Sequence, residues 1–211
     1  MLKGEGLGFT DFFIFTLKIP LSLIEGILRG VPGPVGYKLR YYYYKMFFKK
    51  LGKNVLIDIG VKFSGLRNIS IGDYSYIDAY SLISAYLNEV EIGKRVHVAP
   101  FCIIHANEKI VIEDFVGVSS GVKIYSSTSI ANEKKMSGPT VPKEEMSLRA
   151  EKIIIRKESV LYSNCLLLPG ADIGEGAVVC ANAIISKPIN PYAIAMSNTK
   201  IIGKRPKPKV N

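Results

Sequence analysis

The first candidates for chemistry are the chain's only two histidines, His97 and His105. An imidazole titrates near neutral pH, so histidine is the usual side chain that removes a proton from a reacting hydroxyl group. A catalytic zinc ion typically needs three protein ligands, which two histidines supply only with difficulty. The pair therefore favours proton transfer, and we predict that no metal is required. The alternative at each position is a surface histidine without a role.

The three cysteines do not suggest redox or metal chemistry. Cys102, Cys165 and Cys180 are odd in number and lack the Cys-x-x-Cys spacing of redox and zinc motifs. We interpret Cys102 and Cys165 as small buried side chains. Nothing in this pattern requires an oxidising compartment, so the sequence favours a cytoplasmic protein.

Aliphatic residues recur every six positions through most of the chain. A small residue follows four positions after most of them, and short insertions reset the frame twice. This hexapeptide period is typical of a parallel β-helix, in which eighteen residues form one triangular coil. We therefore predict about six coils. The aliphatic positions are Ile71, Ile77, Ile83, Ile92, Val98, Ile104, Ile112, Val118, Ile124, Ile155, Leu161, Leu167, Ile173, Val179 and Ile185.

The period divides the chain into three parts. Residues 1–52 precede it and are predicted to be helical, whereas residues 53–187 form the β-helix. Within the β-helix, residues 126–152 are polar, contain glycine and proline, and lack the repeat. A loop of this length in a compact domain is usually functional or disordered. Residues 188–211 are predicted to form a short strand and a basic tail.

The boundary between helices and coils is also predicted. A Pro-Gly cluster separates two helices, the second of which is expected over Val35–Leu51. The coils are expected to begin near Val55, with Ile59 and Gly65 continuing the six-residue frame toward the N-terminus.

The net charge of +10 is concentrated in two segments. Residues 36–53 combine lysines, one arginine and several aromatic rings, a composition that suits the membrane–water interface. An equally weighted alternative is a helical cap on the first coil of the same or a neighbouring subunit. The second basic segment is the C-terminal tail. No nucleic-acid-binding module accompanies these segments, so we do not expect a nucleic-acid partner.

The hexapeptide frame, the long loop after the fourth coil and the segment Leu168–Val179 together resemble the hexapeptide-repeat acyltransferases. This family includes the maltose and galactoside acetyltransferases and the sugar O-acetyltransferases of capsule and O-antigen loci. The resemblance implies an all-β fold, a left-handed parallel β-helix, and a homotrimer. It also implies acetyl-CoA as the donor, with active sites in the grooves between adjacent subunits.

The resemblance also bears on the catalytic base. In the maltose and galactoside acetyltransferases the catalytic histidine ends a Tyr-Thr-Ala-Thr-His run, but the matching run here is Tyr125–Ser129 and ends in Ser129. Polysaccharide-locus relatives often carry a histidine at the place of His97. The resemblance therefore favours His97 as the base, with His105 as the second candidate. If neither acts, the acceptor is expected to be a sugar amine, which needs less help than a hydroxyl.

The resemblance implies a second group of residues, which would bind acetyl-CoA. Some would contact the pantetheine arm and others the phosphates. Cys180 and Asn182 replace glycines of the usual motif and Tyr162 replaces another, so their side chains are expected to narrow the groove. The implied cofactor-binding residues are Ser163, Ala181, Ser186, Lys187, Asn198, Lys200, Lys204 and Arg205.

The sequence thus predicts an acetyltransferase that moves acetyl from acetyl-CoA to a sugar hydroxyl in surface polysaccharide biosynthesis. One alternative is an N-acetyltransferase acting on a nucleotide-linked amino sugar. Another is a β-helix scaffold that lacks catalytic activity, and a third is a zinc-dependent γ-carbonic anhydrase. A cytoplasmic enzyme with peripheral contact at the inner face of the cell membrane, through residues 1–52, is left open.

Overall fold

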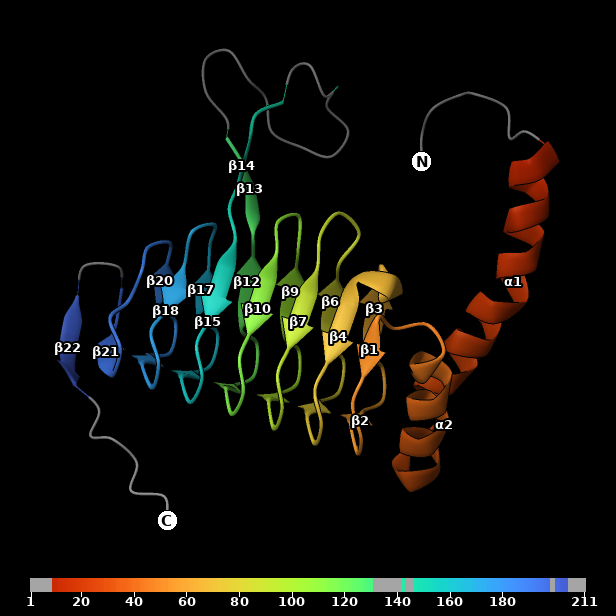
Figure 1. Cartoon of the computed structure of the whole chain (residues 1–211), viewed down its shortest axis with the longest axis horizontal. Helices are drawn as coiled ribbons and strands as arrows, with labels where there is room; N and C mark the ends of the chain where they lie inside the picture. The colour runs from red at the N-terminus through yellow and green to blue at the C-terminus, as the bar shows by residue number, and fades with distance from the viewer. Residues whose placement is uncertain (1–8, 131–141, 143–145, 198–199, 205–211) are drawn as a thin grey trace.

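The computed structural model describes residues 9–130, 142, 146–197 and 200–204, with the backbone alone for residues 9–19 and 204. Two helices come first, α1 (Phe9–Gly30) and α2 (Gly33–Lys45), and short strands follow. The strands wind into a parallel β-helix, as the six-residue period predicts (Figure 1). Figure 1 shows α2 beside the first coil, whereas α1 leads away from the coils.

Three parallel sheets form the walls of the β-helix, and each coil contributes one strand to each sheet. We call them sheets A, B and C in the order in which the chain visits them. Sheet A contains β1 (Lys50–Leu51), β4 (Ile69–Ile71), β7 (Val90–Ile92), β10 (Ile110–Ile112), β15 (Ile153–Ile155) and β18 (Asp172–Ile173). Sheet B contains β2 (Leu56–Ile57), β5 (Tyr76–Ile77), β8 (His97–Val98), β11 (Gly117–Val118), β16 (Val160–Leu161), β19 (Val178–Val179), β21 (Ala193–Ala195) and β22 (Ile201–Lys204). Sheet C contains β3 (Lys62–Ser64), β6 (Leu82–Ser84), β9 (Ile103–His105), β12 (Lys123–Tyr125), β17 (Leu166–Leu167) and β20 (Ile184–Ile185).

Sheets A and C each contain six strands, so the chain builds six complete coils. A seventh begins where Ile189 pairs with Ile173, and it continues into β21. The last strand, β22, runs antiparallel to β21. The short strand predicted after the repeat is therefore β21.

The interior of the coils confirms the predicted frame. All fifteen aliphatic positions are buried, and the small residues four positions later are buried as well. Two of these small residues are serines that join successive coils. Ser75 donates its hydroxyl to the carbonyl of Gly93, and Ser81 donates to that of Ala99. Burial of each large aliphatic side chain stabilises the fold by about 1.5–3 kcal/mol relative to exposure.

The first coil differs from the prediction. Its inward residues are Ile57 and Phe63, which pair with Ile77 and Ile83, rather than Ile59 and Gly65. The cause is an insertion containing a 3₁₀ turn, η1 (Leu66–Asn68), which shifts the frame between the first two coils.

Helix α2 also ends earlier than predicted, at Lys45 rather than Leu51. Lys50 and Leu51 already pair with Ser70 and Ile71 as the first strand of sheet A. The sequence contains no glycine or proline between Lys45 and Leu51, so it carries no signal for a helix end at Lys45. Pairing with the next coil therefore decides where the helix stops.

The insertions share one corner of the β-helix, where sheet C leads into sheet A. The η1 turn, the two short insertions near residues 87–90 and 107–111, and the long loop all leave from this corner. The described base of the long loop is an antiparallel hairpin of β13 (Ser127–Ser129) and β14 (Leu148–Ala150). In Figure 1 this hairpin projects from the side of the coils.

Arg40 fastens the helices to the first coil. Its buried guanidinium donates to the carbonyls of Leu28 and Val31 at the end of α1, and to that of Ile57 in β2. Gly36 lets α2 approach closely, because a Cβ at this position would lie 2.0 Å from the carbonyl oxygen of Val31. Among the described residues, no helix is long and apolar enough to cross a bilayer.

Candidate functional site

His97 lies on the outward face of sheet B, next to the inward Val98. Val98 points into the core, and the His97 side chain is 54% exposed. Its Nε2 lies 3.4 Å from Oδ2 of Asp78, one coil before it. The imidazole stacks on the ring of Tyr76 with 5.3 Å between ring centres. If Nε2 carries the hydrogen toward Asp78, Nδ1 is free to accept a proton.

Tyr76 connects this histidine to a second carboxylate. Its hydroxyl donates to Asp58 Oδ2 at 2.7 Å and lies 3.3 Å from Asp78 Oδ1. Tyr37 of α2 is 3.4 Å from the same hydroxyl. Burial and these neighbours raise the pKa of Tyr76, so it stays protonated. Burial alone would raise the pKa of Asp58, but hydrogen bonds from Tyr76 and a backbone N–H outweigh it and lower that pKa.

Gly117 leaves open space beside His97. The two residues are partners in neighbouring strands of sheet B, and Val160 is the partner of Gly117 one coil further on. A Cβ added at Gly117 would meet only Val160 Cγ1, at 4.0 Å. Tyr76 therefore covers one side of the imidazole, whereas on the other side Gly117 has no side chain to cover it.

His105 lies at the root of the long loop. It pairs with Tyr125 one coil further on and with Ser84 one coil before. A cavity of about 350 Å³ opens here between sheet C and the hairpin. It is lined by His105, Asn107, Tyr125, Ser127, Thr128, Ser129, Met146 and Leu148. Five of these residues belong to the long loop, and none of the described lining residues is a carboxylate.

Ser126 holds the root of the loop in place. Its fully buried hydroxyl accepts hydrogen bonds from the backbone N–H groups of Asn107 (3.0 Å) and Glu108 (2.9 Å). Asn107 in turn donates its side-chain amide to Ser127 Oγ at 2.7 Å. The cavity wall is therefore fixed by hydrogen bonds that cross from the third coil to the fourth.

The structure does not bring the two histidines together within one chain. His97 lies in β8 of sheet B and His105 in β9 of sheet C, although both belong to the third coil. His97 pairs with the carboxylate of Asp78, whereas His105 lines the cavity at the root of the loop and forms no ion pair within the described residues.

The predicted cofactor-binding residues fall in separate places. Ser163 and Ala181 occupy the same corner, between sheets B and C, one coil apart, and the N–H of Asn182 donates to the carbonyl of Ser163 at 3.0 Å. Ser186 and Lys187 follow β20 at the next corner, and exposed Lys200 precedes β22. Asn198 and Arg205 lie outside the described residues, and only the backbone of Lys204 is described.

Sequence reasoning missed the residues that surround His97. Asp58 and Asp78 are 20 positions apart, and Tyr76 and His97 are 21 apart, which is one coil plus its insertion. Stacking the outward positions at the coil length, in addition to the inward ones, would have revealed this column. Among the residues described, no group of three or more histidine, cysteine or acidic side chains is placed to hold a metal ion.

Comparisons with known proteins identify relatives of this chain. The chain is 31% identical over 150 residues to the dTDP-4-amino-4,6-dideoxy-D-glucose acyltransferase of Escherichia coli, covering 71% of this chain and 78% of that one. It is 27% identical to a putative lipopolysaccharide biosynthesis O-acetyl transferase, WbbJ, also from Escherichia coli, over 65% and 69% of the two chains. No family model matches the chain.

Solved structures show the same fold. The N-acyltransferase AntD from Bacillus cereus, in complex with dTDP and 3-hydroxybutyryl-CoA, superposes with a TM-score of 0.73 at 26% identity, covering 79% of this chain and 88% of AntD. A hexapeptide-repeat acetyltransferase from Vibrio cholerae, complexed with acetyl coenzyme A, covers 97% and 95% of the two chains with a TM-score of 0.59 and 17% identity. This chain therefore belongs to the hexapeptide-repeat acyltransferase family.

Proposed function

We propose that this acyltransferase moves the acetyl group of acetyl-CoA to a sugar hydroxyl in the synthesis of a surface polysaccharide. The observation that carries the proposal is the His97–Asp78 pair, since a hydroxyl must lose its proton as it attacks. Nδ1 of His97 takes that proton while the oxygen attacks the thioester carbonyl. The tetrahedral intermediate then expels the CoA thiolate, which recovers the proton as the C–S bond breaks.

A homotrimer would complete the site. The resemblance implies a trimer with grooves between adjacent subunits, and in our proposal sheet B of one subunit faces sheet C of the next across such a groove. His97 and His105 belong to the same coil, so a threefold axis parallel to the axis of the β-helix would hold them at the same height. The carboxylate-paired imidazole of one subunit would then face the cavity beside His105 of its neighbour. This arrangement would explain why neither histidine has a complete site within one chain.

The donor would lie toward the later coils. Relatives with this fold are crystallised with coenzyme A derivatives. The family resemblance puts the pantetheine arm of the donor at the corner occupied by Ser163 and Ala181. The thioester arm needs backbone hydrogen-bonding groups, and the phosphates need cations. Lys187 and Lys200, both exposed, would supply two of these cations.

The second candidate is acyl transfer to the amine of a nucleotide-linked amino sugar. Two observations favour it: Ser129 stands where the loop histidine of the O-acetyltransferases would be, and similar proteins act on a dTDP-linked amino sugar by name. A neutral amine is already nucleophilic, so its transfer would depend less on His97.

Release of CoA thiol in the presence of candidate acceptors tests both functions. We expect turnover with a sugar or glycan hydroxyl acceptor, confirmed by mass spectrometry of an acetyl ester that is cleaved by mild base. An amide product formed with dTDP-4-amino-4,6-dideoxyglucose alone would establish the second candidate instead. A chain that neither turns over nor gains thermal stability from acetyl-CoA would be a scaffold, because a ligand of the folded state raises its melting temperature.

A further inference from the structure

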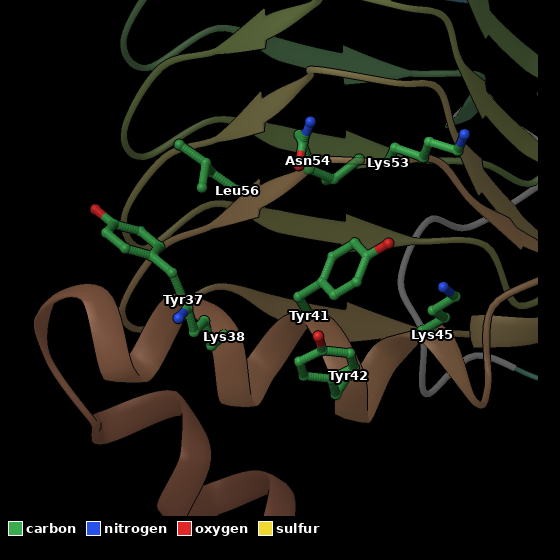
Figure 2. Close-up of a pocket in the computed structure, with 9 residues that line it drawn as sticks. Tyr37, Lys38, Tyr41, Tyr42, Lys45, Lys53, Asn54 and Leu56 are labelled. Atoms are coloured by element: carbon green, nitrogen blue, oxygen red, sulfur yellow. The ribbon is translucent and has the colours of Figure 1, made fainter.

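A second cavity lies at the opposite end of the β-helix from the last coil, between α2 and the first coil. Its volume is about 420 Å³. Helix α2 contributes three tyrosines and two lysines, and the segment Lys53–Leu56 forms the other wall. Figure 2 shows Tyr41 reaching from α2 toward the first coil, where its hydroxyl donates to the carbonyl of Gly52 at 3.1 Å.

The cavity is cationic. Lys38, Lys45 and Lys53 line it, and its lining contains no acidic residue. None of the three ammonium groups forms an ion pair within the described part of the chain, although Lys45 lies 5.5 Å from the centre of the Tyr41 ring. Lys49, by contrast, pairs with Glu89. Three lysines without counter-ions around one cavity favour an anionic ligand.

A stripe of exposed apolar side chains runs along α2 next to this cavity. Val35, Leu39, Tyr42 and Met46 are 63%, 43%, 65% and 72% exposed. At 3.6 residues per turn these positions lie on one face of the helix, and Lys38 and Lys45 lie on the adjoining face, toward the cavity. Tyr42 belongs to both the stripe and the cavity.

The first helix also carries exposed apolar side chains. Leu23 and Ile27, one turn apart on α1, are 63% and 69% exposed. Among the coils, the exposed large apolar side chains sit mostly at corners, whereas in α2 they form a continuous row beside the lysines. An apolar row flanked by lysines and tyrosine is the composition of a helix that lies in the plane of a membrane interface.

We infer that α2 and the cavity beneath it form a binding surface for an anionic phospholipid bilayer. The stripe lies among the upper acyl chains, and the phosphate of a lipid headgroup enters the cavity between Lys38, Lys45 and Lys53. We favour a bilayer over a protein partner because of charge complementarity. The three lysines match the phosphates of an anionic leaflet, and the apolar stripe matches the acyl chains next to them. The inference does not depend on the acyl-transfer reaction.

Co-sedimentation of the full chain with vesicles tests this inference. We expect binding to phosphatidylcholine vesicles that contain phosphatidylglycerol, and weak binding to phosphatidylcholine alone or in high salt. Each lysine near an anionic surface strengthens binding about fivefold. The triple change Lys38→Gln, Lys45→Gln and Lys53→Gln should therefore weaken binding on the order of a hundredfold.

The matched control removes the same charge elsewhere. Lys94, Lys123 and Lys152 are exposed on the coils, and none of them forms an ion pair within the described residues. Their triple change to glutamine should weaken vesicle binding far less than the change at the cavity. Equal losses in the two triple variants would overturn the inference, because binding would then depend on net charge alone.

Two further outcomes would also overturn it. In the first, free dTDP or pyrophosphate protects the three cavity lysines from chemical acetylation, and the protein does not bind vesicles. The cavity would then bind a soluble phosphate ligand. The second concerns Leu39→Gln, which we expect to weaken vesicle binding and leave the oligomeric state intact. If the oligomer instead dissociates and vesicle binding is unchanged, the stripe packs against a neighbouring subunit.

Discussion

The proposed role of His97 as the base leads to two substitutions with different expected effects on kcat. His97→Gln keeps a polar side chain of similar length but removes the proton acceptor. A positioned general base contributes about 10²–10⁴-fold to a rate. We therefore expect kcat for transfer to a hydroxyl acceptor to fall by this factor, with little change in KM for acetyl-CoA, because the imidazole acts on the acceptor.

Asp78→Asn should have a smaller effect, and the structure sets its size. The carboxylate stabilises the imidazolium that forms as the proton is removed, across a separation of 3.4 Å. The His97 side chain is 54% exposed, so screening is close to that of water and the attraction is about 1 kcal/mol. That energy corresponds to about a fivefold fall in kcat. The His97 side chain is exposed, and the amide oxygen introduced by Asp78→Asn can still accept the hydrogen bonds from Tyr76 and the Ala79 N–H, so neither change should lower the melting temperature appreciably.

Steady-state thiol release measures both effects, with Asp172→Asn as the control. Asp172 forms a partly exposed ion pair with Arg156 on sheet A, so this variant makes the same chemical change away from His97. We expect it to retain the parent rate. The reasoning is refuted if His97→Gln keeps more than a tenth of the parent kcat on a hydroxyl acceptor. A collapse in His105→Gln alone would transfer the role of base to that residue.

Three further predictions concern the surroundings of the site. Gly117→Val should leave thermal stability nearly unchanged, because open space surrounds this position, but should lower kcat/KM at least tenfold by filling the space beside the imidazole. Ser126→Ala leaves two backbone N–H groups without their acceptor and should lower the free energy of unfolding by about 2–4 kcal/mol in urea titrations. Burial raises the pKa of Cys102 to about 11 and that of Cys165 to about 12, so a thiol reagent at pH 8 should label half-buried Cys180 alone until the chain is unfolded. Rapid labelling of all three thiols in the native protein would contradict this.

The repeating inward positions of the β-helix could be predicted from Ile71 onward because their constraint is local and repeated. Every inward position must be aliphatic or small, and each coil repeats the requirement at the same spacing. The first coil was mispredicted because a single insertion, η1, changes the frame where only one coil precedes it. Ile59 matched the frame extended backward from Ile71 because it is aliphatic. In the structure Ile57 and Phe63 occupy the inward positions instead.

The candidate site was predictable only in part, for a different reason. His97 and His105 could be found because their residue type is rare in this chain and their positions next to Val98 and Ile104 fix them as outward. Their partners are common residue types whose significance depends on stacking. Asp78 and Tyr76 lie near His97 only because an insertion of three residues makes this coil 21 residues long. The periodicity of the inward residues alone does not show which outward residues stack on one another.

The division between inward and outward positions bears on which residues of sheet B are kept for function. The inward column, Ile57, Ile77, Val98 and Val118, supplies the burial that holds the coils together, and a change there costs stability whatever the enzyme does. The outward neighbours, Tyr76, His97 and Gly117, contribute little to that core. The fold does not require these three residues. The imidazole is half-exposed, the tyrosine hydrogen-bonds two carboxylates, and the glycine does not have a positive φ. The proposed catalytic role of that face explains these residues more simply. A base supplied by sheet B would not depend on the loop, where Ser129 stands in the place of the histidine.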